Sequence, residues 1–304
     1  MRSQFINFTL SLILSPLLLG IINKVKALFA GRKGPPILQL YYDIIKLFKK
    51  GAVYSHSVSW IFTTAPIVSL SALIVALMCV PFPTSGALIS FRGDVIFFVY
   101  LLALSRFATV LAALDTASSF EGMGASREVM YSAIAEPAFL LALAVLLCKT
   151  ANYSLTEIPP SLCYGKWKKE APSYVLISAS LFIILLSENC RVPFDDPNTH
   201  LELTMIHEVM ILDYSGPDLG FMLYASSLKL WIFSSILVLF VLPIPDAINS
   251  ALKILLYFIE VSIVALLIGI IESVMARLNF LKVPLLLLLA TVLSLIGLIL
   301  VFRY

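Results

Sequence analysis

The chain of 304 residues is 60% hydrophobic and 13% charged, and its formal net charge is +3. Soluble domains are roughly half apolar, so this composition and a mean hydropathy of +1.00 indicate a polytopic membrane protein and argue against a soluble enzyme. The basic residues are spread over separate loops, without the basic stripe or the aromatic platform that nucleic acid requires. We therefore expect no nucleic-acid partner.

The four cysteines show no close pairing along the sequence. Zinc knuckles and iron–sulfur clusters take their ligands from closely spaced cysteines. We therefore expect no metal and no cofactor in this chain, and we assign packing roles to Cys79, Cys148, Cys163 and Cys190.

Eight apolar runs are mostly near the roughly 20 residues that cross a bilayer, which predicts an all-α polytopic fold. We expect one transmembrane domain over residues 1–304, with charged cytoplasmic loops. No small-residue cleavage site follows the first run, which favours an uncleaved span over a signal peptide. The fifth run is short, about 14 residues, and could also be a buried half-helix. The runs are 5–29, 58–80, 95–114, 132–148, 174–187, 222–241, 251–271 and 283–302.

The basic residues of the first loop predict the orientation. Loops rich in lysine and arginine face the cytoplasm, so we expect both termini outside and the acidic segment at 188–216 inside, with the 115–131 loop and the 272–282 turn. The loop that holds Lys149, Lys166, Lys168 and Lys169 would then lie outside, but the larger bias of the first loop decides the topology. The basic residues of the first loop are Lys24, Lys26, Arg32, Lys33, Lys46, Lys49 and Lys50.

The first loop is also expected to carry a short amphipathic helix at the membrane surface. Glycines and prolines at 31–36 end the first span, and apolar residues then recur at helical spacing from Leu40 to Phe48. Asp43 and Lys46 are three residues apart and could pair. For this region taken alone, a solvated surface helix with a weak ion pair is favoured over a functional one.

In the third loop, Gly122 and Gly124 predict a tight turn, and Ser126 is a candidate cap for a helix that carries Glu128. Glu136 then falls inside the fourth span. A carboxylate at membrane depth is costly, so Glu136 is a candidate for a proton path, the alternative being a hydrogen-bonded structural acid.

Glu260 and Arg106 fall within the seventh and third spans and invite the same argument. Pairing with neighbouring side chains is the simpler interpretation of both residues.

The segment from Glu188 to Gly216 is the predicted working site. Charge next to the hydrocarbon layer usually lines water or a partner surface, and a cluster of like charges should have raised, coupled pKa values. Redox or docking events could therefore shift its proton occupancy. The acidic residues are Glu188, Asp195, Asp196, Glu202, Glu208, Asp213 and, just beyond, Asp218.

Prolines at 193 and 197 rule out regular helix from Arg191 to Pro197, and Asp196 looks like the cap of the helix that follows. That helix would carry His200, Thr204, His207 and Ile211 on one face and Glu202 nearly opposite. No HExxH pattern is present, so we expect proton-handling, partner-facing or structural histidines rather than metal ligands.

These residues resemble the loop signature of the membrane subunit that lines the quinone chamber of respiratory complex I. The residues concerned are Glu188, Asn189, Arg191, Pro193, Phe194 and Asp195, then Leu201, Glu202 and Leu203, then Asp213, Tyr214 and Ser215. The first loop also resembles the basic loop of that family, at Gly34, Pro35, Leu38, Gln39, Asp43, Lys46 and Leu47. The segments DDPNTHLELTMIHE, LDTASSFEGMGASRE and AEPAFLLAL are more similar to the corresponding subunit of energy-converting, membrane-bound nickel–iron hydrogenases and formate hydrogenlyases.

The resemblance implies a membrane anchor and coupling subunit in a prokaryotic cytoplasmic membrane. The nickel–iron centre and the iron–sulfur clusters would belong to partners, namely hydrogenase large and small subunits and iron–sulfur subunits on the cytoplasmic loops, beside antiporter-like membrane subunits. No catalytic residue is expected in this chain. The implied proton or ion path comprises Asp43, Lys46, Glu136, Glu188, Arg191, Asp195, Asp196, Glu202 and Asp213, with His200, His207 and Glu208 as proton-handling or partner-facing residues.

Two departures from the complex I pattern argue against quinone as the electron acceptor. The chain lacks an insert between Pro35 and Leu38, and it is about one helical turn longer between Leu203 and Asp213. A quinone-site subunit of a complex I-like oxidoreductase, a free-standing ion transporter and a passive anchor are the alternatives. The absence of an internal repeat disfavours the transporter, and the carboxyl of Glu136 disfavours the passive anchor.

Overall fold

The computed structural model describes residues 2–83, 85–150, 154–157, 171–195, 205–241 and 249–303, which are helical with connecting loops and contain no β-strand. Seven of its helices are long and apolar enough to cross a membrane, and α8 (Ala171–Glu188) supplies a shorter apolar helix. The prediction of an all-α fold with about eight spans, one of them short, is confirmed. The long helices are α1 (Arg2–Phe29), α3 (Trp60–Cys79), α4 (Asp94–Asp115), α5 (Ser119–Thr150), α9 (Gly216–Val241), α10 (Ser250–Val274) and α11 (Val283–Arg303).

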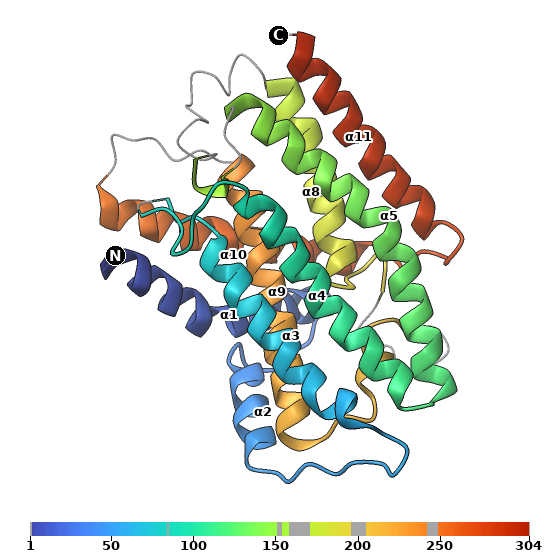
Figure 1. The fold of residues 1–304 in the computed structure, drawn as a ribbon. Helices are drawn as coiled ribbons and strands as arrows, with labels where there is room; N and C mark the ends of the chain where they lie inside the picture. Colours follow the sequence, from blue (N-terminus) through green and yellow to red (C-terminus); the bar gives the residue numbers. More distant parts are fainter. Residues whose placement is uncertain are drawn as a thin grey trace.

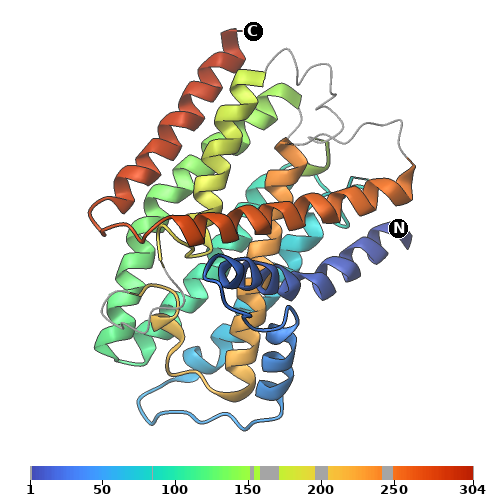
Figure 2. The ribbon, with the colours of Figure 1, turned by 180° about the vertical axis from the view of Figure 1, so that it is seen from behind.

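The helices pack in three groups around α9, which are α1 with α10, α5 with α8 and α11, and α3 with α4 (Figures 1 and 2). The helices α1 and α10 run side by side and both contact α9, while α5, α8 and α11 pack together on the other side. Ser180 of α8 helps to hold the second group, since its hydroxyl donates to the carbonyl of Ala290 at 2.8 Å and contacts the Ser294 hydroxyl at 2.7 Å. The short helix α2 (Gln39–Phe48) lies at the opposite end of the molecule from the C-terminus (Figure 1).

The predicted amphipathic helix of the first loop is present as α2. Ile44 is buried and Phe48 packs on Phe221 of α9 with ring centroids 5.2 Å apart. The expected pair between Asp43 and Lys46 is wrong, because Asp43 accepts a hydrogen bond from Gln39 at 2.9 Å and no ion pair joins it to Lys46 in the part of the chain described.

The third loop differs from the prediction of a turn at its glycines. The turn lies earlier, at Ala117, whose φ is 58°, and α5 already begins at Ser119. Gly124 is therefore inside a helix, where a Cβ would lie 2.9 Å from the carbonyl oxygen of Ile206. Its role is to let α5 approach that backbone closely, and Ser126 is a helical residue and not a cap.

The single glycine of α1, Gly20, also permits close packing against the first loop. A Cβ on Gly20 would lie 1.9 Å from the carbonyl oxygen of Ile37, a contact that only glycine avoids. Gly122 of α5 is also helical, but a Cβ added there would have no neighbour within 4 Å. Gly20 and Gly122 are therefore both helical glycines, but only Gly20 lacks room for a side chain.

We expect Gly20→Ala to destabilise the protein by about 1–3 kcal/mol, because the added methyl group forces the Ile37 backbone away from α1. Gly122→Ala should be neutral or stabilise by roughly 0.5–1 kcal/mol, because alanine is the better helix former. The midpoint of thermal unfolding of the purified protein in detergent measures both changes. Equal midpoints for the two variants would contradict the packing described here.

Candidate functional site

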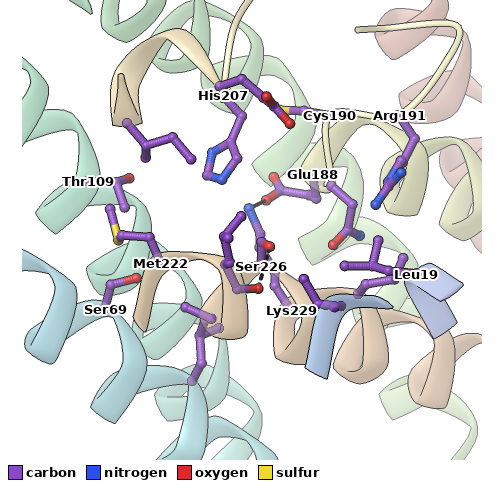
Figure 3. Close-up of a pocket in the computed structure, with 18 of the residues that line it drawn as sticks. Leu19, Ser69, Thr109, Glu188, Cys190, Arg191, His207, Met222, Ser226 and Lys229 are labelled. Atoms are coloured by element: carbon purple, nitrogen blue, oxygen red, sulfur yellow. Dashed lines mark hydrogen bonds and ion pairs between the residues drawn. The ribbon is translucent and has the colours of Figure 1, made fainter. Parts of the chain in front are cut away.

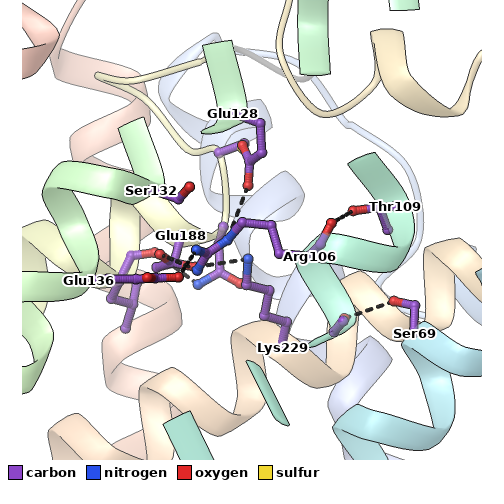
Figure 4. Close-up of polar contacts among 12 residues, drawn as sticks. Ser69, Arg106, Thr109, Glu128, Ser132, Glu136, Glu188 and Lys229 are labelled. Atoms are coloured by element: carbon purple, nitrogen blue, oxygen red, sulfur yellow. Dashed lines mark hydrogen bonds and ion pairs between the residues drawn. The ribbon is translucent and has the colours of Figure 1, made fainter. Parts of the chain in front are cut away.

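A buried arginine joins three acidic side chains in the interior of the helix bundle (Figure 4). Arg106 of α4 is 9% exposed, and its Nη2 atom lies 2.7 and 2.8 Å from the two carboxylate oxygens of Glu188 on α8. Its Nη1 atom donates to Glu136 of α5, and its Nε atom lies 3.8 Å from Glu128, also of α5. Lys229 of α9 completes the group, with its Nζ atom 3.0 Å from Glu188. We call these five residues the Arg106 network.

The sequence places these side chains by simple geometry. Glu128 and Glu136 are eight residues apart, just over two helical turns, so both project from one side of α5 toward Arg106. Glu188 is the last residue of α8, and Lys229 is one cation within the long apolar helix α9. Buried ions are tolerated only when paired and hydrogen-bonded, which fixes the relative positions of the four helices.

The network contains three carboxylates and two cations, so one carboxylate is in excess when all are ionised. Glu128 and Glu188 are buried, whereas the side chain of Glu136 is 40% exposed. Glu136 is therefore the most exposed carboxylate of the network.

Glu136 and Arg106 line a lateral groove of about 410 Å³ between α4 and α5. Most of the other lining residues are apolar and include Tyr100, which is 71% exposed, and Phe107, which is 59% exposed. The groove therefore opens the network toward the side of the helix bundle.

On its other side the network lines a central cavity of about 230 Å³ (Figure 3). Arg106, Glu128, Glu188 and Lys229 all contribute to its wall. The sequence-predicted site residues that line the same cavity are Asp43, Glu188, Arg191, Asp195, His207 and Glu208.

Two side chains of the cavity wall outside the membrane-spanning helices have perturbed acidity. Burial and the nearby cations Lys229 and Arg191 lower the pKa of His207 to about 4, so this imidazole is neutral at physiological pH. Burial, followed by the charges of Glu128 and Asp195, raises the pKa of the Cys190 thiol well above its usual range, so it is not a thiolate.

A second set of ion pairs surrounds the loop after α8. Arg191 lies 3.4 Å from Glu272 of α10, which also pairs with Lys26 of α1 at 2.9 Å. Asp195 is buried, pairs with Arg277 at 3.1 Å and accepts a hydrogen bond from the backbone of Ile206 at 2.7 Å. These contacts tie the loop to α1, to α10 and to the turn after α10.

The structure thus replaces the predicted cluster of like charges with ion pairs. Glu188 and Asp195 each face a cation, because segments distant in sequence bring Lys229, Arg106 and Arg277 to them. Asp213 is exposed and away from the cavity wall, and Lys46 is exposed on α2.

The helix expected to carry His207 and Ile211 on one face is not an α-helix in its described part. Residues 206–208 form a bend and a turn, and a 3-10 helix follows at Val209–Ile211. Irregular backbone from Arg191 to Asp195 is confirmed. The predicted residues Asp196, His200, Glu202 and Thr204 lie outside the described residues.

Sequence reasoning missed Lys229 as a site residue and gave Glu128 and Glu272 no role there. A single lysine inside the apolar run 222–241 was an available signal, since an ionisable residue at membrane depth usually has a partner. The partner of Lys229 could not be predicted from the sequence, because it depends on which helix faces meet. Within the described ranges, no group of three or more histidine, cysteine or acidic residues could hold a metal ion.

Comparisons with known proteins identify the family of the chain. Residues 3–302 match the NADH dehydrogenase family. Hydrogenase-4 component C of Escherichia coli (strain K12) is 33% identical over 277 residues, covering 90% of this chain and 86% of that protein. Formate hydrogenlyase subunit 4 of the same strain is 30% identical over 270 residues, covering 87% of each chain.

More distant relatives share the fold. A chain of the membrane-bound sulfane sulfur reductase, an archaeal respiratory membrane complex, superposes with a TM-score of 0.84 at 21% identity, over 98% of this chain and 99% of that chain. An NADH-quinone oxidoreductase subunit of Burkholderia vietnamiensis (strain G4 / LMG 22486) is 22% identical over 67% of this chain and 60% of its own length. The chain therefore belongs to the NADH dehydrogenase subunit 1 family, as a relative of hydrogenase-4 component C and formate hydrogenlyase subunit 4.

Proposed function

We propose that this chain is the membrane anchor and ion-coupling subunit of a hydrogenase-type complex, in which it links redox chemistry in docked subunits to ion translocation. The observation that carries the proposal is the Arg106 network, which lies between the central cavity and the lateral groove. A passive anchor would not need five ionisable side chains at this depth, because each costs several kcal/mol unless it is paired.

The chemistry of coupling follows from the excess carboxylate. At an effective dielectric constant of 20, two charges about 4 Å apart interact by roughly 4 kcal/mol, which changes proton occupancy by about a thousandfold. A change of charge at the cavity wall can therefore reach Glu136 through Lys229, Glu188 and Arg106. Glu136 would then take up or release a proton at the groove.

The same geometry supports the location of partners. Redox subunits that carry the nickel–iron centre and iron–sulfur clusters would dock on the cytoplasmic loops around α2 and the 189–215 segment, in a prokaryotic cytoplasmic membrane with both termini outside. Antiporter-like membrane subunits would cover the groove beside Glu136, where Tyr100 and Phe107 are exposed. The eight apolar helices act as one transmembrane domain in this proposal.

A quinone-site role is less compatible with the cavity. Pockets for such ligands are usually about 300–1,000 Å³ and mostly apolar, with a few placed polar groups. Here the cavity is about 230 Å³ and its wall carries Arg106, Glu128, Glu188, Arg191 and Lys229. These side chains suit a hydrated junction rather than an isoprenoid chamber.

The orientation can be tested by labelling single cysteines. In a variant without native cysteines, Gly51→Cys lies in the exposed first loop and Ser90→Cys in the exposed loop before α4. We expect an impermeant thiol reagent to reach Gly51→Cys only from the cytoplasmic side and Ser90→Cys only from outside, because the basic first loop stays inside. The reverse pattern would place the docking loops on the wrong side for cytoplasmic redox partners.

The coupling role is tested by removing one exchangeable proton. In complexes reconstituted into liposomes, we expect Glu136→Gln to lower ion translocation by roughly a hundredfold while the complex still assembles, because Glu136 is half exposed and its loss leaves Arg106 paired with Glu188. Glu188→Gln should instead impair assembly, at a cost of about 3–5 kcal/mol, because it leaves two buried cations without their carboxylate.

Ser132→Ala is the matched control, since Ser132 lines the same groove one turn before Glu136 and has no titratable charge. It should translocate ions normally. Full translocation by Glu136→Gln, with assembly confirmed by native gel electrophoresis, would rule out this residue as a coupling group.

A further inference from the structure

Glu260 lies in the middle of α10, apart from the Arg106 network. It is the eleventh residue of a 25-residue helix, about 15 Å from the first residue. Gly269, nine residues later, packs against Ile22 and Val25 of α1. Nine residues are two and a half turns, so Glu260 is on the side of α10 that faces away from α1.

The surroundings on that side of α10 are apolar. Ile263 and Leu267, one and two turns later, are 44% and 46% exposed, as expected for residues that meet lipid or a partner helix. Tyr257, one turn earlier, is buried and donates its hydroxyl hydrogen to Ser235 of α9 at 2.7 Å. The Tyr257 hydroxyl therefore donates its hydrogen to Ser235 and not to Glu260.

The carboxyl of Glu260 has no partner in the part of the chain that the structure describes. Its Oε2 atom is buried without a hydrogen bond, and no described lysine or arginine forms an ion pair with it. Every other acidic side chain in the described α-helices has a hydrogen-bond donor or a cation. Glu136 and Glu188, for example, both contact Arg106.

The charged groups of the neighbouring elements are directed elsewhere. On α1, Lys26 pairs with Glu272 and Lys24 donates to the backbone of the first loop. On α9, Lys229 pairs with Glu188, the carboxyl of Asp218 accepts from Tyr54, and Tyr224 donates to a carbonyl of α1. Lys253, two turns before Glu260 on α10, and Arg92 of the loop that reaches Tyr257 through Phe82 each have an interaction of their own.

We propose that Glu260 is a second proton-binding site of this subunit, which holds its proton at neutral pH and opens to the face of α10 turned away from α1. An isolated carboxylate in apolar surroundings costs far more than a paired one, so the group binds one proton and becomes a neutral carboxylic acid. It would release that proton when a cation or a hydrogen-bond donor of a partner approaches. The inference does not depend on the proposed coupling function.

The test uses the assembled complex in liposomes and dicyclohexylcarbodiimide, which reacts with protonated carboxyl groups in apolar surroundings. At neutral pH we expect the labelled fraction of Glu260, measured by peptide mass spectrometry, to exceed that of Glu188 by about tenfold or more, because Glu188 is held as a carboxylate by Arg106 and Lys229. Labelling should fall as pH rises. It should persist in Glu136→Gln, which separates this site from the Arg106 network.

A second measurement covers the case in which a partner subunit shields Glu260 from the reagent. Infrared spectra of the complex at neutral pH should contain a carbonyl-stretch band of a protonated carboxylic acid that is missing in Glu260→Gln and present in Glu136→Gln. Identical spectra of wild type and Glu260→Gln in this region would overturn the proposal, whatever the labelling shows.

Discussion

The ion pair between Arg106 and Glu188 is the contact on which the interior of this protein depends. Both groups are buried, and their separation of 2.7 Å joins α4 to α8. Leaving one member of such a pair unpaired costs about 3–5 kcal/mol, a large fraction of the stability of most proteins. Glu128, Glu136 and Lys229 extend the pair to α5 and α9, so the helices cannot shift independently without uncovering a charge.

The same ion pairs determine which residues of the site face the central cavity and which face the lateral groove. The buried pairs face the central cavity, where neutral His207 lies among Arg191 and Lys229, while the half-exposed Glu136 faces the lateral groove. In the proposed function, a network with paired charges at its centre and one exposed carboxyl at its edge passes an electrostatic change across the bundle without moving a helix. Glu260 is different, because its Oε2 atom has no hydrogen-bond partner among the described residues and it lies on α10, outside the Arg106 network.

The fold is largely predictable from the sequence, whereas the site is only partly so. Runs of apolar residues predict spans because they reflect the thickness of the bilayer, and the amphipathic pattern of α2 follows from the periodicity of one helix. The partners of Glu188 and Asp195 depend on the way distant helices pack, and hydropathy contains no information on that. For the same reason the sequence around Gly124 predicts a turn, although the role of this glycine is to let α5 approach the Ile206 backbone.

The central claim is that the proton occupancy of Glu136 responds to redox events in docked subunits. The direct measurement is proton uptake by the purified complex in weakly buffered solution when its redox centres are reduced, compared between wild type and Glu136→Gln. We expect wild type to take up more protons than Glu136→Gln. Wild type and Ser132→Ala should take up equal amounts. Equal uptake by wild type and Glu136→Gln would contradict the central claim.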